Sequence, residues 1–181
     1  MPPKLILVGP MGSGKSTVGQ QLARRLGVTF RDTDADIASL AGKSVQDIFV
    51  EDGEPAFRAM ERDAVASAIE DHGGILSLGG GAVLDPSIQQ RLKDQTVVFL
   101  NVGLADAVKR VGLGQGRPLL LGNVRGTIKK LLDDRAPIYN AVATYVVDTD
   151  GRDTSSVVVE IAALLEDDML LGETAPEGED A

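Results

Sequence analysis

The chain alternates between short uninterrupted apolar runs and longer stretches in which apolar residues recur every three or four positions. Residues 5–8, Leu-Ile-Leu-Val, form such a run and end at Gly9, which is the pattern of a strand buried on both faces of a parallel sheet. Residues 16–26 carry apolar side chains four apart and end at Gly27, as an amphipathic helix does. The chain is therefore predicted to begin with a strand, a glycine-rich loop and a helix.

The same two patterns continue through the rest of the chain. Segments with the character of strands are residues 5–8, 28–30, 75–78, 96–100 and 145–147. Segments with helical spacing are residues 16–26, 34–40, 44–50, 54–71, 105–110, 127–134 and 154–165. Strands that alternate with helices predict a single α/β domain, in which a parallel five-stranded sheet is covered by helices on both faces.

Residues 112–126 interrupt this alternation. They contain five glycines and one proline, too many breakers for a regular helix or strand. A loop of this length inside a compact domain is usually a functional lid or a disordered segment, and we predict a mobile lid.

Composition supports a packed domain of modest size. The 181 residues suit one domain, and 43% hydrophobic against 25% charged residues exclude global disorder. Aromatic residues make up only 3%, so Val, Leu, Ile and Ala must build the core. The absence of Cys excludes disulfides and thiolate metal sites and fits a reducing cytoplasm.

Charge and hydropathy limit the partners. The net charge of −9 is the opposite of the basic surplus of nucleic-acid-binding proteins, so no nucleic-acid partner is expected. No apolar run approaches the ~20 residues that span a bilayer, and the N-terminus lacks the layout of a signal peptide, so we expect a cytoplasmic protein without a membrane partner. The sequence shows no exposed apolar stripe that would need burial against a second copy of the chain, which favours a monomer. Acidic residues crowd the end, where residues 169–181 are predicted to be a disordered tail after a folded domain of residues 1–168.

Residues 9–17, Gly-Pro-Met-Gly-Ser-Gly-Lys-Ser-Thr, are called the phosphate loop here because they match G-x-x-x-x-G-K-[ST] at each fixed position. The glycines let successive N–H groups point at phosphate oxygens, and the following helix adds its N-terminal dipole. A chance glycine-rich turn is the alternative, but the position between a buried strand and an amphipathic helix argues against it. We predict ATP with one magnesium ion, bound through Gly12, Ser13, Gly14, Lys15, Ser16 and Thr17. Lys15 would reach the β- and γ-phosphates, and the Ser16 hydroxyl would be a ligand of the ion.

The sequence lacks the marker motifs of two other classes of phosphate-loop protein. A GTPase switch needs a base-reading Asn-Lys-x-Asp motif, which is absent from the sequence. A motor ATPase needs an Asp after the strand at residues 75–78, where this chain has Gly79. These absences favour a kinase.

Asp32 and Asp34 follow the second predicted strand. If the extended conformation persists, residues two apart point the same way, and the carboxylates could hold the water shell of the ion and accept a proton from an attacking hydroxyl. An acidic turn that caps the next helix explains the pair equally well.

Arg58 and Glu61 lie three apart on the predicted helix over residues 54–71, so they share a face. An Arg there could clamp a substrate carboxylate, with Glu61 orienting it. On spacing alone, an ordinary surface ion pair is the simpler interpretation.

Further candidates lie at strand and helix ends. Gly79, Gly80 and Gly81 follow a strand, where a ligand could approach the backbone closely, although a tight turn is also possible. Arg117 in the predicted lid is suited to a transferring phosphate, and its alternative is a solvated loop residue. For Arg135, a charge at the end of a helix is the alternative interpretation. His72, the only His, is expected to have a structural role.

Taken together, these motifs resemble the shikimate kinase family from about Lys4 to Leu165. The matching blocks are residues 9–17, Asp32-Thr33-Asp34, Phe57-Arg58-x-x-Glu61, Leu78-Gly79-Gly80-Gly81-Ala82-Val83, Arg117-Pro118-Leu119 and Arg135-x-Pro137-x-Tyr139. The resemblance implies ATP-dependent phosphorylation of the shikimate 3-hydroxyl, a step of chorismate and aromatic amino-acid biosynthesis. Related small kinases such as gluconate kinases, and a non-catalytic nucleotide-binding module, are the alternatives.

The resemblance also implies residue roles. Asp34 would bind the attacking hydroxyl and act as base, with Lys15 and Arg117 at the transferred phosphate. Arg58 and Arg135 would hold the shikimate carboxylate, Glu61 would orient Arg58, and Gly80 and Gly81 would add backbone contacts. Asp32 would hold the magnesium ion through water.

The adenine side of the site is where the sequence departs from the family pattern. The resemblance implies that Arg110 and Arg152 flank the base. The family commonly has a Pro near position 154, and this chain has Thr154, which puts the detail of the adenine contact in question.

Overall fold

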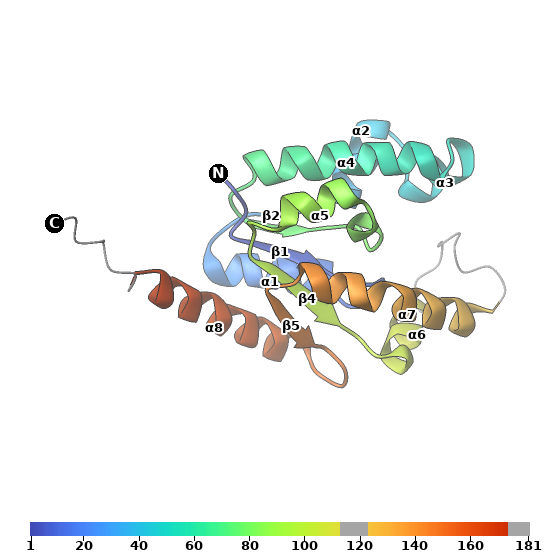
Figure 1. The fold of residues 1–181 in the computed structure, drawn as a ribbon. Helices are drawn as coiled ribbons and strands as arrows, with labels where there is room; N and C mark the ends of the chain where they lie inside the picture. The colour runs from blue at the N-terminus through green and yellow to red at the C-terminus, as the bar shows by residue number, and fades with distance from the viewer. Residues whose placement is uncertain (113–122, 174–181) are drawn as a thin grey trace.

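In the computed structural model, the chain folds into a sheet between two layers of helices (Figure 1). The structure describes residues 1–112 and 123–173, and over residues 168–173 the backbone alone. Within this part of the chain, one parallel sheet has the order β2-β3-β1-β4-β5. Its strands are β1 (Leu5–Val8), β2 (Phe30–Asp32), β3 (Ile75–Ser77), β4 (Val97–Asn101) and β5 (Tyr145–Asp148). The predicted fold class is confirmed.

The sheet places β1 between β3 and β4. Leu5 is in register with Ile75 of β3, and Ile6 with Val97 of β4. Since all the strands run parallel, the segments that follow β1 and β3 leave the sheet side by side, at the carboxyl ends of the strands. Ligands of open α/β sheets bind at such carboxyl ends, so the order of the strands positions the site.

Two hydrophobic cores lie on the two faces of the sheet. Side chains alternate along β1, so Ile6 and Val8 pack into one core and Leu5 and Leu7 into the other. The helices on the Ile6 side are α4 (Glu54–Asp71), α5 (Pro86–Leu92) and α7 (Val124–Val142), and those on the Leu5 side are α1 (Lys15–Leu26) and α8 (Thr154–Glu173). Aliphatic residues build most of both cores, as the low aromatic content predicts.

Two smaller clusters support the cavity described below. Helices α2 (Thr33–Ala41) and α3 (Val45–Glu51) pack against the start of α4 through Ile37, Ile48 and Phe57. Helix α6 (Leu104–Gly112) packs against α7 through Ala107 and Ile128. No helix of the described chain has the length and apolarity that crossing a membrane requires.

Some boundaries differ from the sequence prediction. The 3-10 turn Ala82–Leu84 and helix α5 were not predicted, although Asp85 caps α5 and Ile88 and Leu92 lie buried one turn apart. Strand β2 begins at Phe30, not at residue 28, because the N–H of Val28 donates to Ala23 O and closes the end of α1.

Helix α7 is longer than predicted and continues through Pro137. It begins at Val124, where the side chain of Asn123 accepts from Gly126 N, so the last glycine of the segment predicted as a lid is helical. Helix α6 likewise reaches Gly112. The residues between, including Arg117, lie outside the described chain, and the lid stays a prediction. Helix α8 runs to Glu173, past the predicted start of the tail.

Candidate active site

A cavity of about 590 Å³ opens where β1 and β3 end. Its walls come from the phosphate loop, the beginnings of α2 and α4, the glycines after β3 and one side chain of α7, Arg135. Segments that are far apart in sequence thus meet around one space, and most of the residues predicted for the site are among them.

The phosphate loop has the geometry of an anion cradle. Gly12 and Gly14 adopt positive φ values of 79° and 91°, which residues with a Cβ rarely adopt. Gly14 caps α1 and offers no side chain to accept from the first N–H groups of this helix. Lys15 Nζ donates to Gly9 O at 2.7 Å and to Pro10 O at 3.1 Å, so its ammonium lies across the loop. N–H groups at the start of a helix, beside a cation, suit phosphate oxygens.

Asp32 both caps a helix and faces the phosphate loop. One carboxylate oxygen accepts from Asp34 N at 3.0 Å, and the other accepts from Ser16 Oγ at 3.0 Å. The extended backbone ends at Asp32 and Asp34 lies in the first turn of α2, so the condition of an extended pair is not met, yet both side chains line the cavity. Asp32 is the helix cap that the simpler interpretation requires, and the role of the pair in a site stays a prediction.

The oxygens of Ser16 and Asp32 fit a magnesium ion that arrives with phosphates. Magnesium typically takes one or two protein oxygens and fills its other positions with phosphate oxygens and water. In the described part of the chain no three His, Cys, Asp or Glu side chains are grouped to hold a metal by themselves. The donor set thus fits an ion shared with a nucleotide.

Arg58 and Glu61 on α4 form a buried ion pair that faces the cavity. Arg58 Nη1 donates to Glu61 Oε2 at 2.7 Å, and Arg58 Nη2 lies 3.1 Å from Glu54 Oε1. Glu61 is only 1% exposed, so the interpretation as an ordinary surface pair is wrong. Burial raises the pKa of Glu61, the hydrogen bond from Arg58 opposes this, and the charge of Asp34 adds to it. Glu61 thus orients the Arg58 guanidinium, which remains at the cavity wall.

The glycines after β3 leave room for these side chains. A Cβ on Gly79 would lie 2.6 Å from Asp34 Oδ1 and 2.8 Å from Glu61 Oε1. A Cβ on Gly81 would lie 2.5 Å from the guanidinium nitrogens of Arg58. A tight turn therefore does not fully explain these three glycines, because acidic and basic groups of the cavity pack directly against their backbone.

Arg135 reaches the cavity from α7. It is 9% exposed, and Nη1 donates to Gly80 O at 3.2 Å. The alternative role as a charge at a helix end is wrong, because α7 continues to Val142. Arg58 and Arg135 thus present two guanidinium groups to one cavity, the first beside Gly81 and the second bonded to Gly80 O.

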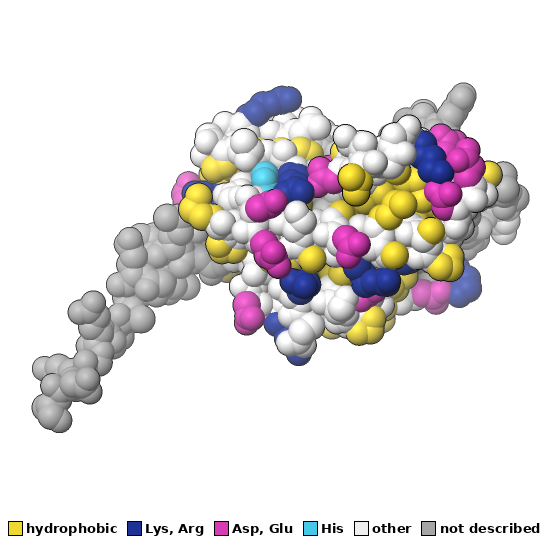
Figure 2. All heavy atoms as spheres, turned by 90° about the horizontal axis from the view of Figure 1, so that it is seen from above, with side chains coloured by type: hydrophobic (Ala, Val, Ile, Leu, Met, Phe, Trp, Pro, Cys, Tyr) yellow, Lys and Arg dark blue, Asp and Glu magenta, His cyan; other side chains and the backbone are white. Residues whose placement is uncertain are grey.

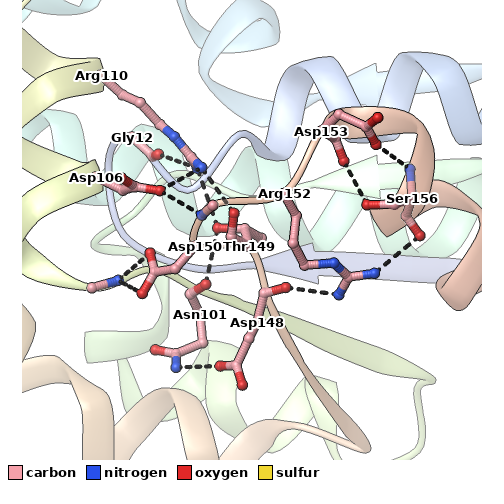
Figure 3. Close-up of polar contacts among 12 residues, drawn as sticks. Gly12, Asn101, Asp106, Arg110, Asp148, Thr149, Asp150, Arg152, Asp153 and Ser156 are labelled. Atoms are coloured by element: carbon pink, nitrogen blue, oxygen red, sulfur yellow. Dashed lines mark hydrogen bonds and ion pairs between the residues drawn. The ribbon is translucent and has the colours of Figure 1, made fainter.

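Arg110 and Arg152, predicted for the adenine side, are not among the residues that line the cavity. Their contacts are drawn in Figure 3. Arg110 Nη1 donates to Gly12 O at 3.1 Å and to Thr149 Oγ1 at 3.2 Å, which ties the phosphate loop to the segment after β5. Arg152 pairs with Glu160 at 2.6 Å and donates to Asp148 O at 2.9 Å. Thr154 is the first residue of α8. Both guanidinium groups are held around the segment that joins β5 to α8.

Two buried residues escaped prediction as part of the site. Thr33 Oγ1 accepts from Gly79 N at 3.3 Å and lies 3.4 Å from Ser77 O, so it joins the start of α2 to the end of β3. The Tyr139 hydroxyl donates to Gly80 O. Both residues stand in the matched motif blocks Asp32-Thr33-Asp34 and Arg135-x-Pro137-x-Tyr139, but no role was predicted for either. His72 is buried with Nε2 3.1 Å from Ile75 O, in keeping with the predicted structural role.

Comparisons with known proteins agree with one another. A family model for shikimate kinase matches residues 11–166. The shikimate kinase of Salinispora arenicola is 57% identical over 165 residues, which cover 91% of this chain and 99% of that protein. The solved shikimate kinase from Acinetobacter baumannii in complex with shikimate has a TM-score of 0.88 at 32% identity, covering 93% of this chain and 94% of that one. A gluconokinase from Sinorhizobium meliloti, at 20% identity and a TM-score of 0.61 over 96% of this chain and 98% of its own, shares the fold alone.

Proposed function

The chain belongs to the shikimate kinase family, and from that premise we propose which residues carry out each part of the transfer of a phosphoryl group from ATP to shikimate. The enzyme phosphorylates the 3-hydroxyl of shikimate, with ATP as donor, and forms shikimate 3-phosphate on the way to the aromatic amino acids. One observation supports this assignment of roles best: a single cavity has the phosphate loop on one wall and Asp34, Arg58 and Arg135 on the others.

The donor half is the phosphate loop. Backbone N–H groups of Gly12, Ser13 and Gly14, with the side chains of Ser16 and Thr17, hold the phosphates of ATP. Lys15 turns from the carbonyls of the loop to the β- and γ-phosphates, where its charge stabilises the leaving group. Ser16 would be a direct ligand of one magnesium ion, and Asp32 would hold it through water. When bound, the ion supplies positive charge that offsets the charge of the phosphates.

The acceptor half is built from α2, α4, α7 and the glycines. Arg58 and Arg135 bind the shikimate carboxylate, and the backbone at Gly80 and Gly81 adds contacts. Two arginines suit this task because a planar guanidinium matches a carboxylate with paired hydrogen bonds. A small polyhydroxylated anion needs such local cations on a protein with a net charge of −9.

Asp34 serves the hydroxyl side of the substrate. It orients the 3-hydroxyl and accepts its proton while the hydroxyl oxygen bonds to the γ-phosphorus and the bond from that phosphorus to the bridging oxygen of ADP breaks. Arg117, which the sequence motif assigns to the γ-phosphate, completes the charge at the transferred group. Arg110 and Arg152 flank the adenine.

The proposal extends to the form of the protein in the cell. The chain acts as a cytoplasmic monomer without nucleic-acid or membrane partners, in which residues 1–168 form the catalytic domain and residues 169–181 an acidic tail. Large exposed hydrophobic residues of the described chain, such as Leu40, Val50 and Val146, lie on different elements. On the face shown in Figure 2, hydrophobic side chains gather toward the end where α4 begins, with Lys, Arg, Asp and Glu interspersed over the rest.

A coupled assay of ADP release tests the proposal. ATP and magnesium are supplied with shikimate, gluconate, nucleoside monophosphates or water as acceptor, and ADP formation is expected with shikimate far above the others. Chelation of the ion is expected to stop turnover and added Mg²⁺ to restore it. Turnover with shikimate no greater than with water would overturn the assignment, and preference for gluconate would move it to a related kinase.

A further inference from the structure

The carbonyl of Gly80 accepts two hydrogen bonds from one helix. Arg135 Nη1 donates to it at 3.2 Å, and the Tyr139 hydroxyl donates to it as well. Arg135 and Tyr139 are four apart on α7, so they lie on the same face of the helix. A carbonyl oxygen has two lone pairs, and both are used here.

The two donors differ in their freedom to move. Tyr139 is 1% exposed, and its ring stacks on Phe99 with the centroids 4.9 Å apart. Burial raises its pKa to about 12, so the hydroxyl keeps its proton at any physiological pH. Arg135 lies at the wall of the cavity on a long flexible side chain. Tyr139 is therefore the fixed donor and Arg135 the one that can turn to a ligand.

Gly80 touches both halves of the site. A Cβ on Gly80 would lie 3.5 Å from Gly9 O and 3.6 Å from Met11 N, so this residue packs against the phosphate loop. Its carbonyl is held from α7, on the acceptor side. A shift of the Gly80 peptide would consequently disturb the space between donor and acceptor.

We propose that Tyr139 is a positioning residue for shikimate, because its hydroxyl keeps the Gly80 carbonyl paired while Arg135 leaves that carbonyl to bind the substrate carboxylate. The inference rests on the proposed role of Arg135. Without the hydroxyl, binding of shikimate would remove the second of the two donors that the described residues give to this partly buried carbonyl, and an unpaired acceptor in such a place weakens binding.

Tyr139→Phe tests this inference, since it removes one oxygen and keeps the ring that stacks on Phe99. The KM for shikimate and its Kd by calorimetry are expected to rise roughly fivefold to tenfold, the worth of about one hydrogen bond. The KM for ATP is expected to stay unchanged. Tyr145→Phe, the same change at the other tyrosine of the chain, is the matched control and is expected to leave all three unaltered. The KM for shikimate is measured at low temperature with saturating ATP, which keeps the variants folded by mass action.

The methyl ester of shikimate separates positioning from a general loss of structure. The ester has no negative charge to attract Arg135 away from the Gly80 carbonyl. Tyr139→Phe is therefore expected to weaken competitive inhibition by the ester less than twofold. Para-aminophenylalanine at position 139, which restores an N–H donor on the same ring, is expected to recover the affinity for shikimate. Unchanged affinity for shikimate in the Phe variant, or equal losses for acid and ester, would overturn the inference. A wild-type enzyme that does not turn over shikimate would instead refute the proposed function.

Discussion

Arg58 and Glu61 form an ion pair of 2.7 Å in which the carboxylate is buried and the guanidinium stays at the wall of the cavity. The pair holds one cation ready for an anionic substrate, and it leaves the protein with a carboxylate whose pKa is raised by burial. Both consequences can be measured with one substitution.

Glu61→Gln keeps the shape of the side chain and removes its charge. We expect the KM for shikimate to rise about threefold to tenfold, because Arg58 loses the charged partner that orients it. The KM for ATP should stay the same. Steady-state kinetics with each substrate varied in turn measure the split, and Glu70→Gln on the exposed end of the same helix is the control. An unchanged KM for shikimate would show that Arg58 is oriented by other contacts.

The raised pKa of Glu61 also predicts a dependence of stability on pH. A carboxylate that holds its proton more tightly in the folded state contributes stability below its ordinary pKa, near 4.5, and loses that contribution as the pH rises through the folded value. The Tm of the wild type relative to Glu61→Gln should therefore fall as the pH rises above 4.5. Thermal unfolding of both proteins across this range measures it, and parallel curves would contradict the shift.

Asp34→Asn removes the proposed base and keeps the size of the side chain. We expect kcat to fall by at least about 100-fold, the usual contribution of a general base, with the Kd for ATP unchanged. Asp36→Asn on the same helix, which breaks only the ion pair of Asp36 with Arg31, should keep its turnover. Full activity of the Asp34 variant would remove this residue from the mechanism.

Gly79→Ala adds a methyl group where Asp34 and Glu61 lie closest to the backbone. Contacts of 2.6 and 2.8 Å would force both side chains to move, and overpacking of this kind costs about 1–3 kcal/mol. We expect a lower Tm and a fall in kcat/KM for shikimate of roughly tenfold or more. Gly73→Ala is the control, since its methyl group would meet only the side chain of Met1 at 3.5 Å. Equal behaviour of the two variants would contradict the close packing at Gly79.

Thr33→Val replaces the buried hydroxyl that joins α2 to the end of β3. Gly79 N would lose its acceptor, so the free energy of unfolding should fall by about 1–3 kcal/mol. The value of kcat should fall too, because Asp34 follows Thr33 directly in the chain. Thr33→Ser keeps the hydroxyl and should lie much closer to the wild type. Denaturant unfolding and turnover of both variants check this, and a Val variant as active as the Ser variant would contradict it.

Asp85→Ala removes the cap of α5, where the carboxylate accepts from Ser87 N at 2.8 Å. The free energy of unfolding at pH 7 should fall by about 1 kcal/mol without a change in kcat. Hydrogen bonds from Ser87 lower the pKa of Asp85 to about 2. The stabilisation is therefore present above the ordinary value near 3.8 and is lost as the pH falls toward 2. Asp94→Ala, at an exposed position, should show neither effect.

The sequence predicted best those elements whose pattern is long or sharply bounded. The helix expected over residues 54–71 has those bounds in the structure, and β1 and α1 match their predictions closely. The helix predicted over residues 127–134 ends before Pro137, whereas α7 continues through this proline to Val142. In the fold, Arg135 and Tyr139 on both sides of Pro137 are tied to Gly80 O, and such tertiary contacts sustain a helix that local propensity would end.

Site residues could be proposed where a motif specifies the type and spacing of side chains. Contacts between a side chain and a distant backbone group could not be predicted. Arg58, Glu61 and Arg135 could be proposed from type and spacing, although the burial of Glu61 could not. Thr33 and Tyr139 stand in the matched motif blocks, but their contacts were not predicted because their partners, Gly79 and Gly80, lie 46 and 59 positions away in the chain. A hydrogen bond to a distant peptide group leaves no pattern in a single sequence.

The order of the strands has a consequence for how such enzymes diversify. Because β1 lies at the middle of the sheet, the proposed acceptor groups of α2, α4 and the glycines gather on its β3 side, where Arg135 reaches them from α7, while the Arg110 and Arg152 contacts gather on its β4 and β5 side. Substitutions on one flank can therefore retune selectivity for the acceptor without redesign of nucleotide binding on the other. A library confined to α2, α3 and the start of α4 is the natural place to look for kinases of this scaffold with new alcohol substrates.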